Sequence, residues 1–349
     1  MSKSLKIGDL ELKVPVVQGG MGVGISLSGL AGNVSACGGL GVISTAQIGW
    51  REPDFYEKPF EANFRAIEKE IKKARELAKG GVLGVNIMVA TQRYEEYVKS
   101  AVKAGIDIII SGAGLPIDLP KYVEGSKTKI APIVSSLKSL TVICRMWERK
   151  YQTAPDLVVI EGPKAGGHLG FSREELETVT DEAYDNVIVS IIEKVKEYSE
   201  KFSKKIPVVV AGGIYERKDM EHVMKLGADG VQMGTRFVTT KECDADDAYK
   251  QSYIKAKKED IKIVQSPVGM PGRAILNPFL EKVKTEKCKI KHCYQCIVTC
   301  DKKTIPYCIT EALVNAAEGR VDEGLLFCGE NAYRADKIET VAEIMEEFR

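Results

Sequence analysis

One short segment of the chain places a titratable side chain among small residues. Residues 161–170 read Glu-Gly-Pro-Lys-Ala-Gly-Gly-His-Leu-Gly, and they follow an apolar run at 157–160 that is typical of a buried strand. Glycines allow a backbone to approach a flat ligand, and the imidazole of His168, with an ordinary pKa near ~6.5, suits proton transfer. A tight turn with a surface histidine is the alternative. We predict that His168 acts on a ligand bound beside this segment.

Two more glycine turns follow consecutive predicted strands, and their pattern favours a phosphate site. Gly212-Gly213 follows one strand and Gly234-Thr235 follows the next. On neighbouring parallel strands, bare backbone N–H groups and a short helix beginning at Thr235 would form a pocket for a phosphate group. Arg236 either adds positive charge to that pocket or pairs with a surface acid. Two ordinary tight turns are the alternative to a phosphate site.

The turn Gln18-Gly19-Gly20-Met21 and the side chain of Asn86 suit a planar ring. Glycines leave room for the face or edge of a ring, and an amide offers both a donor and an acceptor. A ligand that combines a phosphate group with a flat redox-active ring is FMN, so we predict FMN as the cofactor. Phosphosugar-binding barrels use the same kind of phosphate pocket, so a phosphosugar isomerase or synthase without flavin stays open.

The elements that carry these turns alternate between short apolar runs and amphipathic segments. Such alternation, with eight strands within about 240 residues, favours an α/β fold of the (β/α)8 TIM barrel type, in which the C-terminal ends of all strands share one face. An open doubly wound sheet is the alternative, but residues 19–24 lack the G-x-G-x-x-G spacing of a dinucleotide loop. The predicted strands are Val14–Gln18, Gly41–Ser44, Leu83–Met88, Asp107–Ser111, Ile130–Ser135, Leu157–Glu161, Ile206–Ala211 and Gly230–Gly234.

The bulk composition argues against several classes of partner. The 349 residues include 50 basic and 49 acidic side chains, for a formal net charge of +1. This balance indicates neither a nucleic-acid nor a membrane-surface partner. Residues 1–13 lack the apolar core of a signal peptide, and no apolar run approaches the ~20 residues of a membrane span. We therefore expect a cytoplasmic protein that acts on a small-molecule substrate.

The barrel pattern stops near residue 275. We divide the chain there, into an FMN-binding barrel over residues 1–275 and a small, cysteine-rich, mostly helical extension over residues 276–349. An amphipathic stretch at 337–348 predicts a final helix, which would pack either on the barrel or on the second subunit of a homodimer.

The extension carries a cluster of cysteines whose number and spacing suggest a metal. The cluster begins with a C-x2-C pair, Cys293 and Cys296, and continues with Cys300 and Cys308. Four thiolates are a suitable ligand set for zinc or an iron–sulfur cluster. Reduced thiols in a small cap and a redox-active pair of Cys293 and Cys296 are the alternatives.

Seven strings of the sequence together resemble the nitronate monooxygenase (2-nitropropane dioxygenase) family, which includes the flavin-dependent enoyl-acyl-carrier-protein reductases. The strings are PVVQGGMG, GLGVIS, GVNIM, ISGAG, EGPKAGGHLG, VVVAGGI and GADGVQMGTRF, within residues 8–275. The resemblance implies a barrel that holds FMN noncovalently, with His168 as the catalytic histidine. The FMN contacts that it implies are Gly20, Met21, Asn86, Glu161, Gly166, Gly212, Gly213, Gln232, Gly234 and Thr235.

The resemblance implies two reactions for one site. In the first, a nitronate monooxygenase uses O2 to oxidise an alkyl nitronate to a carbonyl compound and nitrite, with His168 as the catalytic base. We rank this reaction ahead because that branch of the family is broad. In the second, an enoyl-acyl-carrier-protein reductase uses NADH or NADPH to reduce an enoyl thioester. An acyl carrier protein would then be a partner of the chain. Glu161, where the family's monooxygenases often carry glutamine, and the strings QGGM and GVNIM favour the second reaction.

Overall fold

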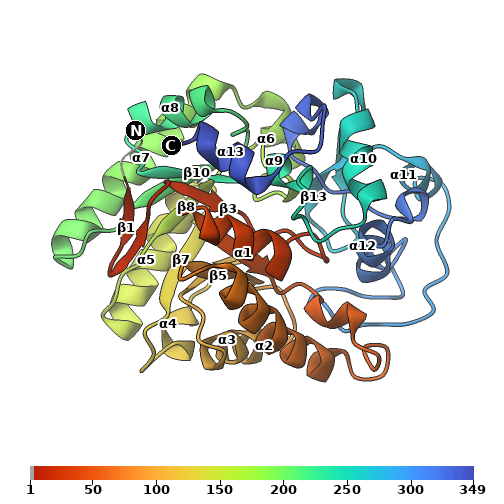
Figure 1. Cartoon of the computed structure of the whole chain (residues 1–349), viewed down its shortest axis with the longest axis horizontal. Coiled ribbons are helices and arrows are strands. Elements are labelled where there is room, and N and C mark those ends of the chain that lie inside the picture. Colours follow the sequence, from red (N-terminus) through yellow and green to blue (C-terminus); the bar gives the residue numbers. More distant parts are fainter. Residues whose placement is uncertain (1–3) are drawn as a thin grey trace.

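Eight parallel strands close into a barrel surrounded by helices in the computed structural model, which describes residues 4–349 (Figure 1). The ring closes where Val231 pairs with Val16. This confirms the predicted barrel and each of its eight strands, with boundaries displaced by at most two residues. The barrel strands are β3 (Val16–Gln18), β4 (Leu40–Ser44), β5 (Leu83–Met88), β6 (Ile108–Gly112), β7 (Lys129–Val134), β8 (Val158–Glu161), β10 (Val208–Ala211) and β11 (Gly230–Met233).

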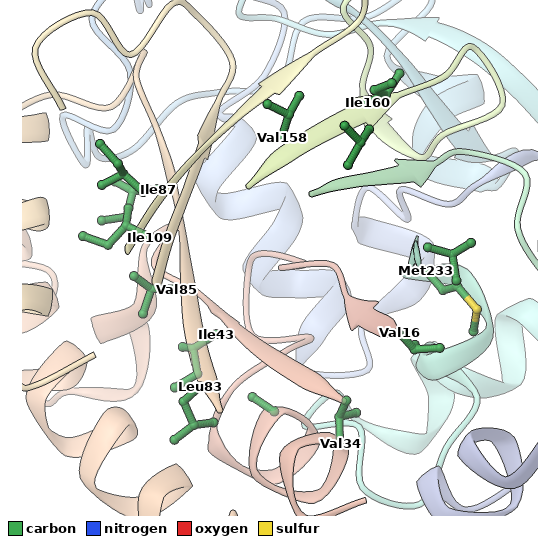
Figure 2. Close-up of a cluster of buried hydrophobic side chains, with 14 of the residues drawn as sticks. Val16, Val34, Ile43, Leu83, Val85, Ile87, Ile109, Val158, Ile160 and Met233 are labelled. Atoms are coloured by element: carbon green, nitrogen blue, oxygen red, sulfur yellow. The ribbon is translucent and has the colours of Figure 1, made fainter. Parts of the chain in front are cut away.

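Both faces of the barrel wall are buried, which is why its strands are continuous apolar runs. Val158 and Ile160 of β8 belong to the hydrophobic layer that the strands share with the surrounding helices (Figure 2). Val159, between them, belongs instead to the cluster inside the barrel with Val17 and Val209. Successive side chains of a strand point to opposite faces, so a wall that is buried on both sides favours apolar residues at successive positions.

The helices of the barrel follow the predicted amphipathic segments. Pro59 stands at the start of α2, where its missing N–H costs no helical hydrogen bond. The hydroxyl of Ser136 accepts the Ser139 N–H at 3.2 Å and caps α5. These helices are α1 (Ser28–Ala36), α2 (Pro59–Leu77), α3 (Tyr94–Lys103), α4 (Leu119–Tyr122), α5 (Leu137–Tyr151), α7 (Asp181–Lys201) and α8 (Arg217–Lys225).

Two small β structures were absent from the sequence prediction. A hairpin of β1 (Leu5–Ile7) and β2 (Leu10–Leu12) buries its leucines against the interior of the barrel. A second antiparallel sheet contains β9 (Gly167–His168), β12 (Ile261–Gln265) and β13 (Pro271–Ile275). Strands of two to five residues carry too weak a period to stand out in a sequence.

The extension after residue 275 lies against the barrel. Its helices are α11 (Pro278–Lys282), α12 (Ile309–Ala317) and α13 (Val341–Glu347). Ile344 and Phe348 join the hydrophobic layer of the barrel helices, so the final helix packs on the barrel, one of the two predicted sites. The division of the chain at residue 275 stays a prediction. Within residues 4–349 no helix is long and apolar enough to cross a membrane.

Candidate functional site

A single cavity at the C-terminal ends of the barrel strands brings together His168 and all ten residues that were predicted to contact FMN. The barrel topology explains this, because parallel strands present all their C-terminal turns at one rim. The predicted residues that line the cavity are Gly20, Met21, Asn86, Glu161, Gly166, His168, Gly212, Gly213, Gln232, Gly234 and Thr235.

One side of the cavity presents free backbone donors. Gly212 and Gly213 have φ angles of 95° and 89°, a left-handed conformation that favours glycine. The N–H groups of Gly213, Gly234 and Thr235 donate to no acceptor within the described chain. The helix α9 (Thr235–Val238) begins at this point, as predicted. Three unpaired donors on residues that line one cavity make this the part of the cavity best suited to an anionic group.

Two segments distant in sequence hold this donor corner in place. The Thr235 hydroxyl accepts the N–H of Gly329 at 3.0 Å, and Asn331 Nδ2 donates to the Gly213 carbonyl at 2.7 Å. Arg236 points elsewhere, because its guanidinium pairs with Glu339 at 3.2 Å and Glu347 at 2.7 Å. Of the two predicted roles for Arg236, the structure therefore supports pairing with acids.

The side of the cavity at the end of β3 has the close backbone approach expected for a planar ligand. A Cβ atom on Gly20 would lie 2.4 Å from the Cβ of Asn86, so only glycine fits there. The Met21 N–H donates to the Ser26 hydroxyl at 2.8 Å, which fixes the turn. Asn86 Nδ2 donates to the Ile110 carbonyl at 3.3 Å and leaves the side-chain oxygen of Asn86 available as an acceptor.

Two long polar side chains line the cavity without hydrogen bonds to the rest of the described chain. These are Glu161, at the end of β8, and Gln232, in β11. Burial raises the pKa of Glu161 from 4.5 to about 7, so a large fraction of this carboxyl group is neutral near pH 7. A neutral carboxyl and an amide can each donate and accept a hydrogen bond.

His168 lies on β9, and the β12–β13 hairpin holds its backbone. His168 pairs with Gly272, and the Leu169 N–H donates to the Pro271 carbonyl at 2.9 Å. The imidazole Nε2 is 2.8 Å from the Ser266 hydroxyl, and the Phe327 ring lies edge-on to it. Burial lowers the pKa of His168 from 6.5 to about 4, so the imidazole is neutral near pH 7.

The sequence prediction missed much of the apolar wall of the cavity. Met88 and Ile133 come from barrel strands, whereas Leu313 of α12 and Phe327 come from the extension. The hydroxyl of Tyr253 donates to the Phe327 carbonyl at 2.6 Å and holds the last of these in place. An apolar residue outside the barrel pattern has no local signal that assigns it to the site.

The predicted metal site is not supported. Within residues 4–349, no group of three or more His, Cys, Asp or Glu side chains could hold a metal ion. Cys293, Cys296, Cys300 and Cys308 are all free thiols; Cys293 is exposed and the other three are partly buried. The C-x2-C spacing misled the prediction because the intervening backbone does not turn all four sulfur atoms toward one point.

A closed (β/α)8 barrel with a donor corner, a close glycine turn and a partly buried imidazole at its C-terminal rim has the architecture of a TIM-barrel enzyme. The family model described as nitronate monooxygenase matches residues 3–349, and the chain belongs to this family. It is therefore an oxidoreductase, and the phosphosugar enzyme that the sequence left open is set aside.

Known proteins from different branches of the family resemble the chain. A probable nitronate monooxygenase of Staphylococcus saprophyticus is 26% identical over 299 residues, which cover 79% of each chain. The structure of FabK from Thermotoga maritima has a TM-score of 0.72 at 27% identity and covers 97% of this chain and 92% of that one. A nitroalkane oxidase of Streptomyces ansochromogenes has the same TM-score at 19% identity, covers 97% and 95% of the two chains, and shows the shared fold.

Proposed function

We propose that the cavity holds FMN. The unpaired N–H groups of Gly213, Gly234 and Thr235 fit its phosphate, and the turn at Gly20 fits the close approach of its ring system. Glu161 and Gln232 would supply hydrogen bonds to polar atoms of the ring. When bound, FMN supplies the transfer of a hydride or of single electrons, for which protein side chains are unsuited.

We further propose that the reaction is the reduction of an enoyl thioester by NADH or NADPH. The apolar part of the cavity wall and the neutral imidazole of His168 carry this proposal. Met88, Ile133, Leu313 and Phe327 are apolar, and burial keeps the imidazole of His168 neutral. Such a surface suits a neutral acyl chain better than a small anion, which would need a positive partner when buried.

The pairing of the lysine in the cavity wall also favours the enoyl reductase over the nitronate monooxygenase. Lys164 is the one lysine or arginine along the described cavity wall, and its ammonium pairs with Asp181 at 2.7 Å. Its side chain lies beside Gly213, where a Cβ atom would be 3.1 Å from the Lys164 Cδ. The ammonium already has a carboxylate partner, so it is a poorer partner for an anionic nitronate bound in the cavity.

In this proposal each side chain has a defined task. The net reaction adds a hydride from the nicotinamide and a proton from solvent to the carbon–carbon double bond, so that electrons and atoms balance. The apolar wall orients the acyl chain and excludes water, which strengthens hydrogen bonds within the site. His168 donates a hydrogen bond to the thioester carbonyl, where negative charge grows during the reaction. The similarity to FabK supports this assignment.

Oxidation of an alkyl nitronate is the second candidate. A neutral imidazole is the form of His168 that can accept a proton from a nitroalkane, and burial favours that form. The curated relatives with the name probable nitronate monooxygenase also support this candidate, at 22–26% identity.

Anaerobic reduction of the bound flavin distinguishes the two candidates. The purified, FMN-loaded protein is mixed with NADH, NADPH or ethylnitronate, and the loss of flavin absorbance is followed. We expect rapid reduction by a nicotinamide, followed by reoxidation on addition of crotonyl thioester carried on coenzyme A or an acyl carrier protein. Rapid reduction by nitronate alone would reject the enoyl reductase in favour of the second candidate.

Variants of two histidines test the role of the imidazole. His168→Ala should retain the flavin and lose at least about a hundredfold in turnover, the usual range for one acid–base or donor group. His222→Ala is the matched control, because His222 is exposed and bonded to Asp185 at 2.9 Å. Equal turnover in the two variants would reject the role of His168.

A further inference from the structure

The side chain that is hydrogen-bonded to the imidazole of His168 is buried in an ordered turn. Ser266 follows β12, and only 2% of its surface is exposed. Its N–H donates to the Met270 carbonyl at 3.0 Å, and its carbonyl accepts the Gly269 N–H at 3.1 Å. These bonds hold the Ser266 hydroxyl at its distance of 2.8 Å from His168 Nε2.

The hydrogen-bond inventory of this hydroxyl indicates the direction of the bond. The oxygen accepts the N–H of Val268 at 3.4 Å. Its own O–H has no acceptor in the described chain other than His168 Nε2. A hydroxyl carries a single proton, so the satisfied arrangement has Ser266 donating to a bare Nε2. A neutral imidazole with a bare Nε2 carries its proton on Nδ1.

We propose that Ser266 is a positioning residue that holds His168 in the tautomer with the proton on Nδ1. Nδ1 has no hydrogen-bond partner in the described chain, so it is the ring nitrogen that is available to a ligand. This inference rests on the proposed function for its catalytic meaning, since an Nδ1–H group can donate to the carbonyl oxygen of an enoyl thioester.

The assignment also bears on the choice between the two candidate reactions. A base that removes a proton from the carbon of a nitroalkane needs a bare nitrogen directed at that carbon. In the tautomer that Ser266 selects, the bare nitrogen is occupied by the serine O–H. The geometry therefore favours an imidazole that donates a hydrogen bond over one that accepts a proton from substrate.

Nitrogen NMR of the imidazoles tests the tautomer without any substrate. The chain has only three histidines, so 15N-histidine labelling of the FMN-loaded protein gives few signals, and His168→Ala identifies those of residue 168. We expect Nε2 of His168 to resonate at the position of a bare nitrogen and Nδ1 at that of a protonated one. Ser266→Ala should move Nε2 toward the protonated position, and Ser266→Thr, which keeps the O–H, should restore it.

Kinetics provides the second readout. Ser266→Ala should lower kcat about tenfold, the effect of one lost hydrogen bond of about 1.4 kcal/mol, with a smaller change in KM. The pKa of His168, measured from the pH dependence of its 15N shifts, should rise in Ser266→Ala, because a hydrogen bond donated to Nε2 favours the neutral imidazole. Ser190→Ala is the matched control, since the Ser190 hydroxyl donates to the Val187 carbonyl within α7, outside the cavity lining.

The NMR and kinetic experiments can reject the role of Ser266 and the proposed function independently of each other. A protonated Nε2 in the wild-type protein, or an NMR spectrum unchanged by Ser266→Ala, overturns the inference whatever the substrate proves to be. The predicted tautomer together with no turnover of enoyl thioesters overturns the proposed function and leaves the role of Ser266 in place.

Discussion

The ring of Phe327 lies edge-on to the imidazole of His168, with ring centroids 5.0 Å apart and an angle of 65° between their planes. The two residues are far apart in sequence, one on β9 and the other in the extension beyond residue 275. Phe327 reaches this position by an isolated antiparallel pairing with Ala274 of β13, and the Cys328 N–H donates to the Arg273 carbonyl at 3.0 Å. The extension thus completes the surroundings of the proposed catalytic side chain.

Removal of the Phe327 ring should therefore impair catalysis more than flavin binding. Phe327→Ala is expected to lower kcat/KM about tenfold, because the imidazole loses an aromatic contact worth about 0.5–1.5 kcal/mol. Phe279→Ala is the matched control, since Phe279 packs on Tyr307 in the extension without lining the cavity. Steady-state kinetics and flavin fluorescence measure the two effects. An equal loss of kcat/KM in both variants would indicate a general loss of structure.

The cavity contains two groups whose titration should change stability in opposite directions. Burial lowers the pKa of His168 from 6.5 to about 4, so between these values the unfolded chain binds more protons there and stability rises with pH. Burial raises the pKa of Glu161 from 4.5 to about 7, so between these values the folded chain binds more protons there and stability falls as pH rises. The two contributions partly cancel in the wild-type protein.

Single variants should separate these two contributions. Relative to wild type, the free energy of unfolding of Glu161→Gln should increase from pH 4.5 to 6.5, and that of His168→Ala should decrease over the same range. Urea titrations of the flavin-free proteins at several pH values measure both trends. Parallel pH dependences in all three proteins would mean that neither group has its shifted pKa.

The donor corner should tolerate no side chain at Gly212. Its φ of 95° costs about 1–2 kcal/mol for an L-residue, and a Cβ atom there would lie 2.9 Å from the Gly162 carbonyl oxygen. Gly212→Ala should displace the β8–β9 turn and weaken FMN binding at least about tenfold, or 1.4 kcal/mol, by fluorescence titration.

Gly227 provides a matched control for the glycine experiment. Gly227 has a comparable φ of 107°, but its nearest neighbour would be 3.6 Å from the Cβ, and it lies before β11 at the opposite end of the barrel. Gly227→Ala should lose a similar ~1–2 kcal/mol of stability and keep its flavin affinity. If both variants bound FMN equally, the donor corner would not be the phosphate site.

The cysteines should differ widely in reactivity. Cys293 is the exposed thiol, whereas burial raises the pKa of Cys144 and of Cys243 to about 12. Because the thiolate is the reactive form, iodoacetamide should modify Cys293 first and should reach the two buried thiols only after unfolding. Peptide mapping by mass spectrometry gives the order. Protection of Cys293 in the native protein would contradict its free, exposed state.

The sequence alone determined the barrel and most of the proposed cofactor site. Buried parallel strands are continuous apolar runs such as Val158–Ile160, and a closed barrel brings the turns that follow them to one rim. The glycine turns at Gly20, Gly212 and Gly234 and the side chain of His168 could be assigned to one cavity for that reason.

Only the tertiary structure decided which side chains surround the imidazole of His168 and which acids pair with Arg236. Ser266 lies 98 positions from His168 in sequence, and its contact depends on the register of two short antiparallel strands. The partners of Arg236 come from the end of the chain. The cysteine spacing predicted a metal site, but the described residues of the folded chain do not form one. Local patterns report the period and burial of an element, but contacts between distant segments depend on how the whole chain packs.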